Sequence, residues 1–281
     1  MSNHQTEDIT AYYRETLGHY RTWGLLDARS LHYGLWDSET RSLHDSLLNM
    51  TRFLTDVVTG EPVGDVLDAG CGVGGISISI AGKAGCRVTG ITLYDELAEQ
   101  AKRFSIQEGT DDRTRFEVMD FTRTTFADAT FDTVLACESS CHAHPKTAFL
   151  NEMNRILKPG GRLIIADYFL TGRPDPCRWI EKWGATWAIS DFNSETNFVQ
   201  PLTRTGFTLL RDEDLSRQIL PTARRMYLAF WLSALPSVFY NFFIGARRYA
   251  AIHYRSGYYQ YKALKSGLWK YRLLVARKTG G

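Results

Sequence analysis

A regular alternation of short apolar runs and amphipathic segments occupies residues 64–170 and constrains the fold more than any other feature. The runs are GDVLDAG, CRVTGIT, RTRFEVMD, FDTVLACES and RLIIADYF, and each has the length and composition of a strand. The segments between them include GGISISIAGKAG, DELAEQAKRFSIQEG and PKTAFLNEMNRIL, which read as helices. Strands that alternate with helices predict an α/β fold with a doubly wound, mostly parallel sheet and right-handed crossovers.

Two less regular parts flank this core. Residues 1–60 are aromatic, and we expect a helical segment that closes over the functional site of a core at 61–170. Residues 171–281 contain two further candidate strands, GFTLLRDED and YRLLVARK. We expect these two strands to extend the sheet to seven, with the helices between them forming a substrate cap.

Bulk composition excludes some function classes. The net charge is +2, which argues against nucleic acid as an obligatory partner. The five cysteines form no Cys-x-x-Cys pair, so we expect reduced thiols in a cytoplasmic protein without a structural metal site.

One uncharged stretch, residues 226–246, lies between Arg224-Arg225 and Arg247-Arg248. A continuous helix of this length would span roughly 30 Å, the thickness of a bilayer core. Pro236 and Asn241 interrupt the stretch. We expect a buried cap, and leave open a peripheral membrane contact or a transmembrane span.

The loop after the first predicted strand contains Gly70-x-Gly72-x-x-Gly75. Glycines at this place let the backbone approach a ligand, and the amides of the next helix favour an anionic group. The pattern alone is also the dinucleotide fingerprint, which is a weak signal, and a plain tight turn is the remaining alternative.

Three residues distinguish between these ligands. Asp68 precedes the loop, where a carboxylate suits a cationic ligand and would repel a pyrophosphate. Thr92 stands where a dinucleotide site needs an acid. Asp120 closes the third strand, where it can accept from an adenine amine while Phe121 packs near the ring. The pattern favours S-adenosyl-L-methionine (SAM).

The segments VLDAGCGVGG, VMDF and RILKPGGRLIIAD together resemble the class I SAM-dependent methyltransferases over roughly residues 60–170. The resemblance implies a Rossmann-like fold and SAM as the cofactor. It also implies which residues bind SAM. Asp68, Gly70, Cys71 and Gly72 would line its methionine end, Thr92 and Leu93 would face the ribose, and Asp120 and Phe121 would face the adenine. Most of the class has Asp or Glu where this chain has Thr92.

Residues after the fourth predicted strand bear on the acceptor. Glu138-Ser-Ser-Cys141-His142-Ala resembles a stretch of the sterol C-methyltransferases and, less closely, of the tocopherol methyltransferases. Tyr20-x-x-Trp23-Gly24 and Ser30-Leu31-His32-Tyr33 are similar to the N-terminal region of the sterol enzymes. The segment YQYKALKSGLWKYRLLVARK is similar to the end of the tocopherol type.

These residue types suit methyl transfer to carbon. Methylating an alkene places positive charge on carbon, which calls for a preorganised negative charge, aromatic faces and a base that removes a proton. Glu138 is the candidate for the charge and for a cofactor contact, and His142 is the candidate base. The two residues are four apart, so they would face the same cavity if the loop begins a helical turn. His32 and Tyr33 are further catalytic candidates. We therefore expect an apolar small-molecule acceptor, namely a sterol, terpenoid or other prenyl lipid.

Alternatives remain at this point. On the same fold, an N- or O-methyltransferase of a small amine, phenol or natural product needs only proximity and a base. A non-enzymatic SAM-binding or membrane-associated scaffold is the third possibility. Glu138 alone could bond the cofactor, His142 could cap a helix, and His32 and Tyr33 could only close over the cofactor.

Overall fold

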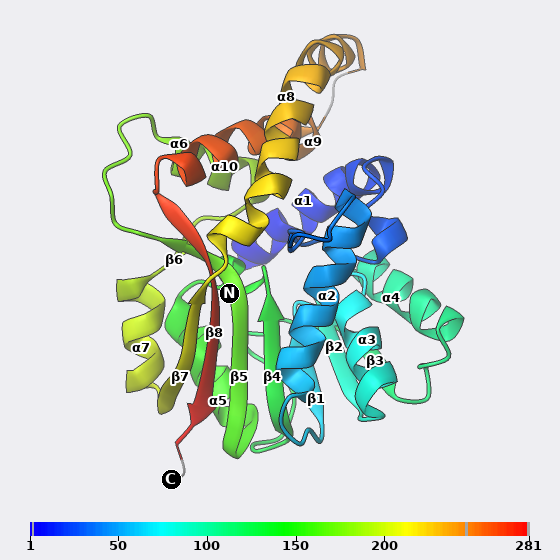
Figure 1. Cartoon of the computed structure of the whole chain (residues 1–281), viewed down its shortest axis with the longest axis vertical. Helices are drawn as coiled ribbons and strands as arrows, with labels where there is room; N and C mark the ends of the chain where they lie inside the picture. Colours follow the sequence, from blue (N-terminus) through cyan, green and yellow to red (C-terminus); the bar gives the residue numbers. More distant parts are fainter. Residues whose placement is uncertain (2, 245–246, 280–281) are drawn as a thin grey trace.

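A single twisted sheet organises the molecule (Figure 1). The computed structural model describes residues 1, 3–244 and 247–279, without the side chains of residues 3 and 235–244. The strands are β1 (Val66–Ala69), β2 (Val88–Thr92), β3 (Thr114–Val118), β4 (Phe131–Cys137), β5 (Leu157–Leu170), β6 (Asn193–Ser194), β7 (Phe207–Asp214) and β8 (Trp269–Lys278). Their order is β3-β2-β1-β4-β5-β8-β7, and the short β6 pairs with β5.

The predicted mostly parallel, doubly wound sheet is confirmed. Strands β1 to β5 pair in parallel, and β8 pairs antiparallel with both β5 and β7. The two strands expected at the sheet edge are β7 and β8. The two-residue β6 adds an eighth strand that its length made invisible in the sequence.

Helices cover both faces of this sheet and its upper edge (Figure 1). The α-helices are α1 (Asn3–Thr22), α2 (Leu43–Thr59), α3 (Gly75–Ala84), α4 (Asp95–Gln107), α5 (Lys146–Ile156), α6 (Trp179–Trp187), α7 (Gln200–Arg204), α8 (Ser216–Ile244), α9 (Arg248–Ile252) and α10 (Ser256–Lys265). Short turns of 3-10 helix are η1 (Leu26–Ala28), η2 (Ser140–His142) and η4 (His253–Arg255), and η3 (Glu195–Val199) is a π-helix.

Buried residues of the central strands alternate between the two faces of the sheet. Val66 and Ile164 belong to one apolar cluster, and Leu67 and Ile165 belong to another. Successive side chains of a strand point to opposite faces, so strands this apolar need helices on both sides. The rigid sheet between these clusters fixes the positions of its strand ends.

The helices α6, α8, α9 and α10 lie above the carboxyl ends of the parallel strands, and α1 crosses the same edge (Figure 1). Three of them, α8 to α10, are inserted between β7 and β8. The uncharged stretch 226–246 falls mainly in α8, and its residues 245–246 lie outside the described residues. Within the described ranges, no helix combines the length and the apolarity that a membrane span requires.

Candidate functional site

Ends of four neighbouring strands bring the predicted residues to one edge of the sheet. Asp68 lies near the end of β1, and Thr92 is the last residue of β2. Asp120 follows the end of β3 by two residues, and Glu138 follows β4 directly. Because these strands are parallel, their carboxyl ends share one edge, which is where open α/β sheets bind ligands.

The glycine loop runs from β1 to α3 in left-handed backbone conformations, with φ of +97° at Gly70 and +53° at Gly72. A Cβ on Gly70 would lie 2.3 Å from the Cβ of Ser139, so Gly70 lets the loop pack against the segment after β4. A Cβ on Gly72 would meet only the flexible side chain of Leu31, at 3.2 Å. Cys71 between them is partly buried. The backbone at Gly72 is therefore open to a ligand.

Asp68 provides a buried carboxylate beside this loop. It accepts a hydrogen bond of 2.6 Å from the Ser77 hydroxyl, and burial raises its pKa to about 6. A cation bound nearby would favour the ionised carboxylate and be favoured by it. The site thus fits the positively charged aminoacyl end of SAM.

The Asp120 carboxylate lies at the far end of the same edge. Its Oδ1 accepts from the Thr122 amide at 2.8 Å, and its Oδ2 lies 3.1 Å from the Met1 ammonium. A nitrogen donor thus stands where an adenine amine is expected. Phe121 packs edge to face on Phe149, with ring centroids 5.3 Å apart.

Thr92 and Leu93, predicted to face the ribose, lie between these two ends. Thr92 is buried, and its carbonyl accepts from the Met119 amide at 2.9 Å. Leu93 is half-buried in the turn that leads from β2 to α4. The two residues therefore stand at the strand end between the glycine loop and Asp120.

Glu138 is held by three donors. Its Oε1 accepts from the Tyr33 amide at 2.7 Å and from the Tyr271 hydroxyl at 2.8 Å, and its Oε2 accepts from the Tyr168 hydroxyl. The residue has a φ of +50°, which is rare outside glycine. Burial raises the pKa of its carboxyl to about 8, and the three donors oppose that rise. This carboxyl therefore titrates close to neutral pH.

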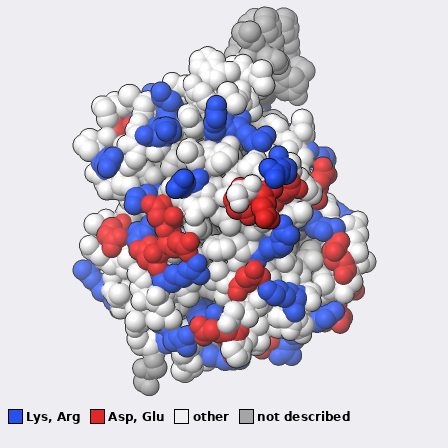
Figure 2. Space-filling view, in the orientation of Figure 1, with Lys and Arg blue, Asp and Glu red and all other residues white. Residues whose placement is uncertain are grey.

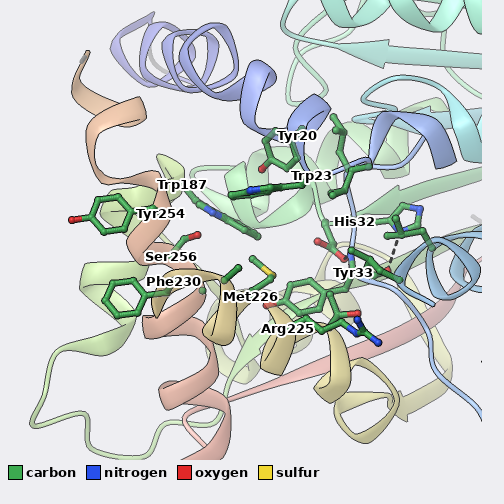
Figure 3. Close-up of a pocket in the computed structure, with 18 of the residues that line it drawn as sticks. Tyr20, Trp23, His32, Tyr33, Trp187, Arg225, Met226, Phe230, Tyr254 and Ser256 are labelled. Carbon is green, nitrogen blue, oxygen red and sulfur yellow. Dashed lines mark hydrogen bonds between the residues drawn. The ribbon is translucent and has the colours of Figure 1, made fainter. Parts of the chain in front are cut away.

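The same carboxyl lines a cavity of about 230 Å³ beneath the cap. In Figure 3 the rings of Tyr20, Trp23 and Trp187 lie on one side of the cavity, and Met226 of α8 lies across from them. The remaining wall is made mostly of apolar and aromatic side chains, including Leu25, Leu31, Tyr33, Leu43, Leu47, Ala229, Phe230 and Tyr254. Leu31 also contacts the loop at Gly72, so the cavity adjoins the predicted SAM site.

Two predicted catalytic residues, Tyr33 and His32, line this cavity, but their polar groups are hydrogen-bonded to other parts of the protein. The Tyr33 hydroxyl donates to Gln260, and the contact to Glu138 comes from the Tyr33 backbone. The His32 ring is buried between the Tyr33 carbonyl, 2.9 Å from Nδ1, and the Thr51 hydroxyl, 3.3 Å from Nε2. Burial lowers the His32 pKa to about 4, so this ring is neutral at pH 7.

His142 departs from the expected arrangement. We expected Glu138 and His142 to face one cavity, but only Glu138 is among the lining residues. His142 ends the 3-10 turn η2, which directs its ring toward Tyr13, at 6.4 Å between centroids. Burial lowers its pKa to about 4, and its Nδ1 has no hydrogen-bond partner among the residues described.

Sequence reasoning missed the two phenols that bind Glu138. Tyr168 on β5 and Tyr271 on β8 are buried register partners. Each occurs in a segment that we recognised as a strand. No local pattern indicates that β8 returns antiparallel beside β5, so the pairing of these tyrosines was hidden.

Comparison with known proteins bears on the family of this chain. A methyltransferase domain family matches residues 67–165. Methyltransferase GfsG of Streptomyces halstedii is 31% identical over 205 residues, which are 72% of this chain and 74% of that protein. A probable chloroplastic tocopherol O-methyltransferase of Oryza sativa subsp. japonica is 27% identical over 232 residues, with 76% of this chain and 63% of that protein covered. Sterol 24-C-methyltransferase of Eremothecium gossypii is 40% identical over 110 residues, or 39% and 30% of the two chains.

The chain thus spans less than two thirds of the rice and Eremothecium proteins. Among solved structures, geranyl diphosphate C-methyltransferase from Streptomyces coelicolor A3(2), in complex with Mg²⁺, geranyl diphosphate and S-adenosyl-L-homocysteine, superposes with a TM-score of 0.77. The identity is 20%, and 98% of each chain is covered. At this identity the likeness concerns the fold. The sequence relatives include both groups whose motifs this chain resembles.

Proposed function

The chain belongs to the class I SAM-dependent methyltransferases, and we propose that it methylates a carbon atom of a sterol, terpenoid or other prenyl-lipid acceptor. The observation that carries this proposal is the Glu138 carboxyl in the wall of an aromatic, largely apolar cavity. An acceptor with a nitrogen or oxygen lone pair would need neither this charge nor these rings.

The cofactor is SAM, which supplies a methyl group to the acceptor. Its binding residues are proposed here from the geometry. Asp68 would attract the cationic aminoacyl end, and the open backbone at Gly72 would accommodate it. Asp120 would accept from the adenine amine at the other end of the sheet edge. Thr92, a buried residue, would stand beside the ribose.

The cavity wall would stabilise the cation that forms on the acceptor. When the acceptor double bond attacks a methyl group, its electron pair makes the new carbon–carbon bond, and the positive charge stays on the neighbouring carbon. Faces of Tyr20, Trp23 and Trp187 can stabilise this charge through their ring quadrupoles. The apolar lining would also exclude water, which would otherwise capture the cation.

Glu138 would then remove the proton. A carbon–hydrogen bond next to the cation breaks, its electron pair restores a double bond, and the proton passes to Oε1 or Oε2. The carboxyl must be ionised for this step. Its pKa of about 8 is that of the protein without SAM, and a bound sulfonium cation would lower it. Glu138 suits this role better than His142, which lies off the cavity and whose pKa is lowered to about 4.

Two kinds of relative bear on the acceptor. Tocopherol, named for the rice relative, carries a prenyl-derived chain but is methylated on oxygen according to that name. The Eremothecium relative is named for methylation of a sterol carbon. Both names support an extended apolar acceptor, and the Glu138 environment supports carbon as the methylated atom.

The test is incubation with SAM labelled in its methyl group and a panel of sterols, terpenoids and prenyl lipids beside small amines and phenols. We expect label on carbon of a prenyl-type acceptor, located by nuclear magnetic resonance of the product. Label only on nitrogen or oxygen would overturn the proposal.

The test variant is Glu138→Gln, and its matched control is Glu39→Gln, which makes the same change at an exposed glutamate. Glu138→Gln is expected to lower kcat by roughly 10²- to 10⁴-fold, the usual contribution of a general base. SAM affinity is measured alongside by calorimetry. Retained activity of Glu138→Gln would contradict the assignment of the base.

A further inference from the structure

The helix α8 has two different long faces. Met226, Ala229, Phe230 and Ser233 line the cavity. On the other side, Leu228, Trp231 and Leu232 are 50%, 59% and 81% exposed. Residues three and four apart share a helix face, so these three apolar side chains form one exposed patch, which we call the outer face. Exposed apolar surface this concentrated marks a contact site.

A basic residue begins the same face. Arg224 lies one turn before Leu228 and is exposed, whereas Arg225 lines the cavity and its guanidinium lies 4.8 Å from the centre of the Trp36 ring. Arg224 shares its helix face with Leu228 and Leu232, four and eight residues further on. The long side chain of Arg224 can therefore reach the headgroups while the neighbouring apolar side chains enter the acyl region.

The part of the chain that follows Asp214, which forms α8, α9, α10 and β8, is strongly basic. Twelve of the 33 Lys and Arg residues, but none of the 31 Asp and Glu residues, follow Asp214 in the sequence. Some of these cations pair with acids of the body, as Arg248 does with Asp8 and Arg272 with Asp212. Within the described part of the chain, others have no ion pair, namely Arg224, Arg225, Arg247, Arg255, Lys262 and Lys265.

Figure 2 shows this separation on one side of the molecule. Lys and Arg occur over the whole of this face, but Asp and Glu are concentrated on its middle and lower part and are nearly absent from the upper part. A net charge of +2 for the whole chain therefore hides a basic cap on an acidic body. Such a cap is complementary to an anionic surface.

We propose that the cap docks on the surface of an anionic lipid membrane, with Leu228, Trp231 and Leu232 among the acyl chains and Arg224 among the headgroups. Because the opposite face of α8 lines the cavity, only this helix separates part of the cavity from the footprint. Insofar as the acceptor is a prenyl lipid, which rests on the proposed function, it enters from the bilayer. An acidic protein partner would use the charges but would not need the outer face.

The docking is tested with the full chain in the absence of SAM and acceptor, so its failure is distinct from failure of the proposed function. Co-sedimentation is measured with vesicles of phosphatidylcholine, with and without about a quarter phosphatidylglycerol, at about 0.15 M salt. We expect binding to the anionic vesicles, with affinity lower by roughly tenfold or more in Trp231→Ser/Leu232→Ser and in Arg224→Glu.

Matched controls are Ile106→Ser, at a side chain 64% exposed on α4, and Arg204→Glu, at an exposed arginine on α7. Both are expected to bind as the unmodified protein does. Circular dichroism verifies that each variant is folded. The proposal is overturned if the unmodified protein leaves anionic vesicles unbound or if Ile106→Ser loses as much affinity as the double variant. It is also overturned if the double variant binds normally, which would show that charge alone holds the protein on the vesicles.

A second measurement reports insertion directly. Nitroxide-labelled lipids quench tryptophans that enter the acyl region, and Trp183 and Trp269 are buried in the protein. We expect quenching in the unmodified protein and its reduction in Trp231→Leu, which keeps the apolar patch and therefore still binds. Undiminished quenching in Trp231→Leu would contradict insertion of this residue.

Discussion

Tyr168 and Tyr271 are partners across β5 and β8, and their hydroxyls bind the two different oxygens of one carboxylate, that of Glu138. The pair fixes the orientation of the carboxyl at the end of β4. It also favours the ionised form, because each hydroxyl donates a hydrogen bond to the carboxylate. The sheet thereby sets both the position and the proton affinity of the proposed base.

Removing one of these hydroxyls is expected to change the pH dependence of methyl transfer. In Tyr271→Phe the carboxylate loses a donor, so the pKa of Glu138 rises. The ascending limb of kcat/KM against pH should move to higher pH by about one unit. Tyr261→Phe, on α10, is the control and should leave the profile in place. A uniform loss of activity without a shift would show that Tyr271 does not act through this carboxyl.

Stability of the SAM-free protein should depend on Glu138 in a way that reverses the usual behaviour of a carboxylate. Its folded pKa of about 8 lies above the ordinary 4.5. The folded state thus holds a proton that the unfolded state has released, and stability falls as pH rises from about 5 to 8.

Glu138→Gln removes this titration. The variant should therefore gain stability relative to the unmodified protein as pH rises, by roughly 3 to 4 kcal/mol between pH 5 and pH 8. Urea unfolding at several pH values measures the difference, and Glu39→Gln serves as the reference. A difference that stays constant with pH would refute the raised pKa.

His142 is expected to be dispensable for proton transfer. Burial lowers its pKa to about 4, so it is neutral throughout the range near pH 7. His142→Gln should keep most of kcat and show the same pH profile. A decrease of roughly a hundredfold or more with SAM affinity intact would restore His142 as the base.

Two glycines of the loop should respond differently to alanine. Gly70→Ala would place a Cβ 2.3 Å from Ser139 in a left-handed backbone, and we expect lower thermal stability and loss of measurable SAM binding. Gly72→Ala is also strained, at a φ of +53°, but it meets only the side chain of Leu31, so the protein should stay folded with a smaller loss of stability while SAM binds more weakly. Calorimetric titration with SAM and thermal unfolding distinguish the two effects. Equal stability of both variants would contradict the collision at Ser139.

Much of the fold could be predicted because its signals are local. The runs around Leu67, Ile91 and Val134 are apolar, each is followed by a turn and a helix, and parallel sheets need this pattern. The order of strands at the edge could not be derived in the same way, since β8 pairs with β5 and β7 across long stretches of chain. The two-residue β6 has no sequence signal of its own.

For the site, residues at strand ends were predictable and their partners were not. Asp68, Asp120 and Glu138 each follow or end a recognisable strand. The spacing of Glu138 and His142 suggested a shared α-helical face, but η2 is a short 3-10 turn that places the histidine elsewhere. The hydrogen bond from the Tyr33 amide to Glu138 could not be predicted either, because every residue except proline has a backbone donor.

The insertion of β8 between β5 and β7 has a consequence for how the protein is made. During synthesis β7 emerges long before β8, and among the described strands β8 is the one with which β7 pairs. Until β8 is in place, β5 is an exposed edge, Tyr271 has not reached Glu138, and the apolar cap helices have no closed body beneath them. A nascent chain in which β8 has not yet docked therefore has an open sheet edge and a Glu138 carboxyl without its Tyr271 partner.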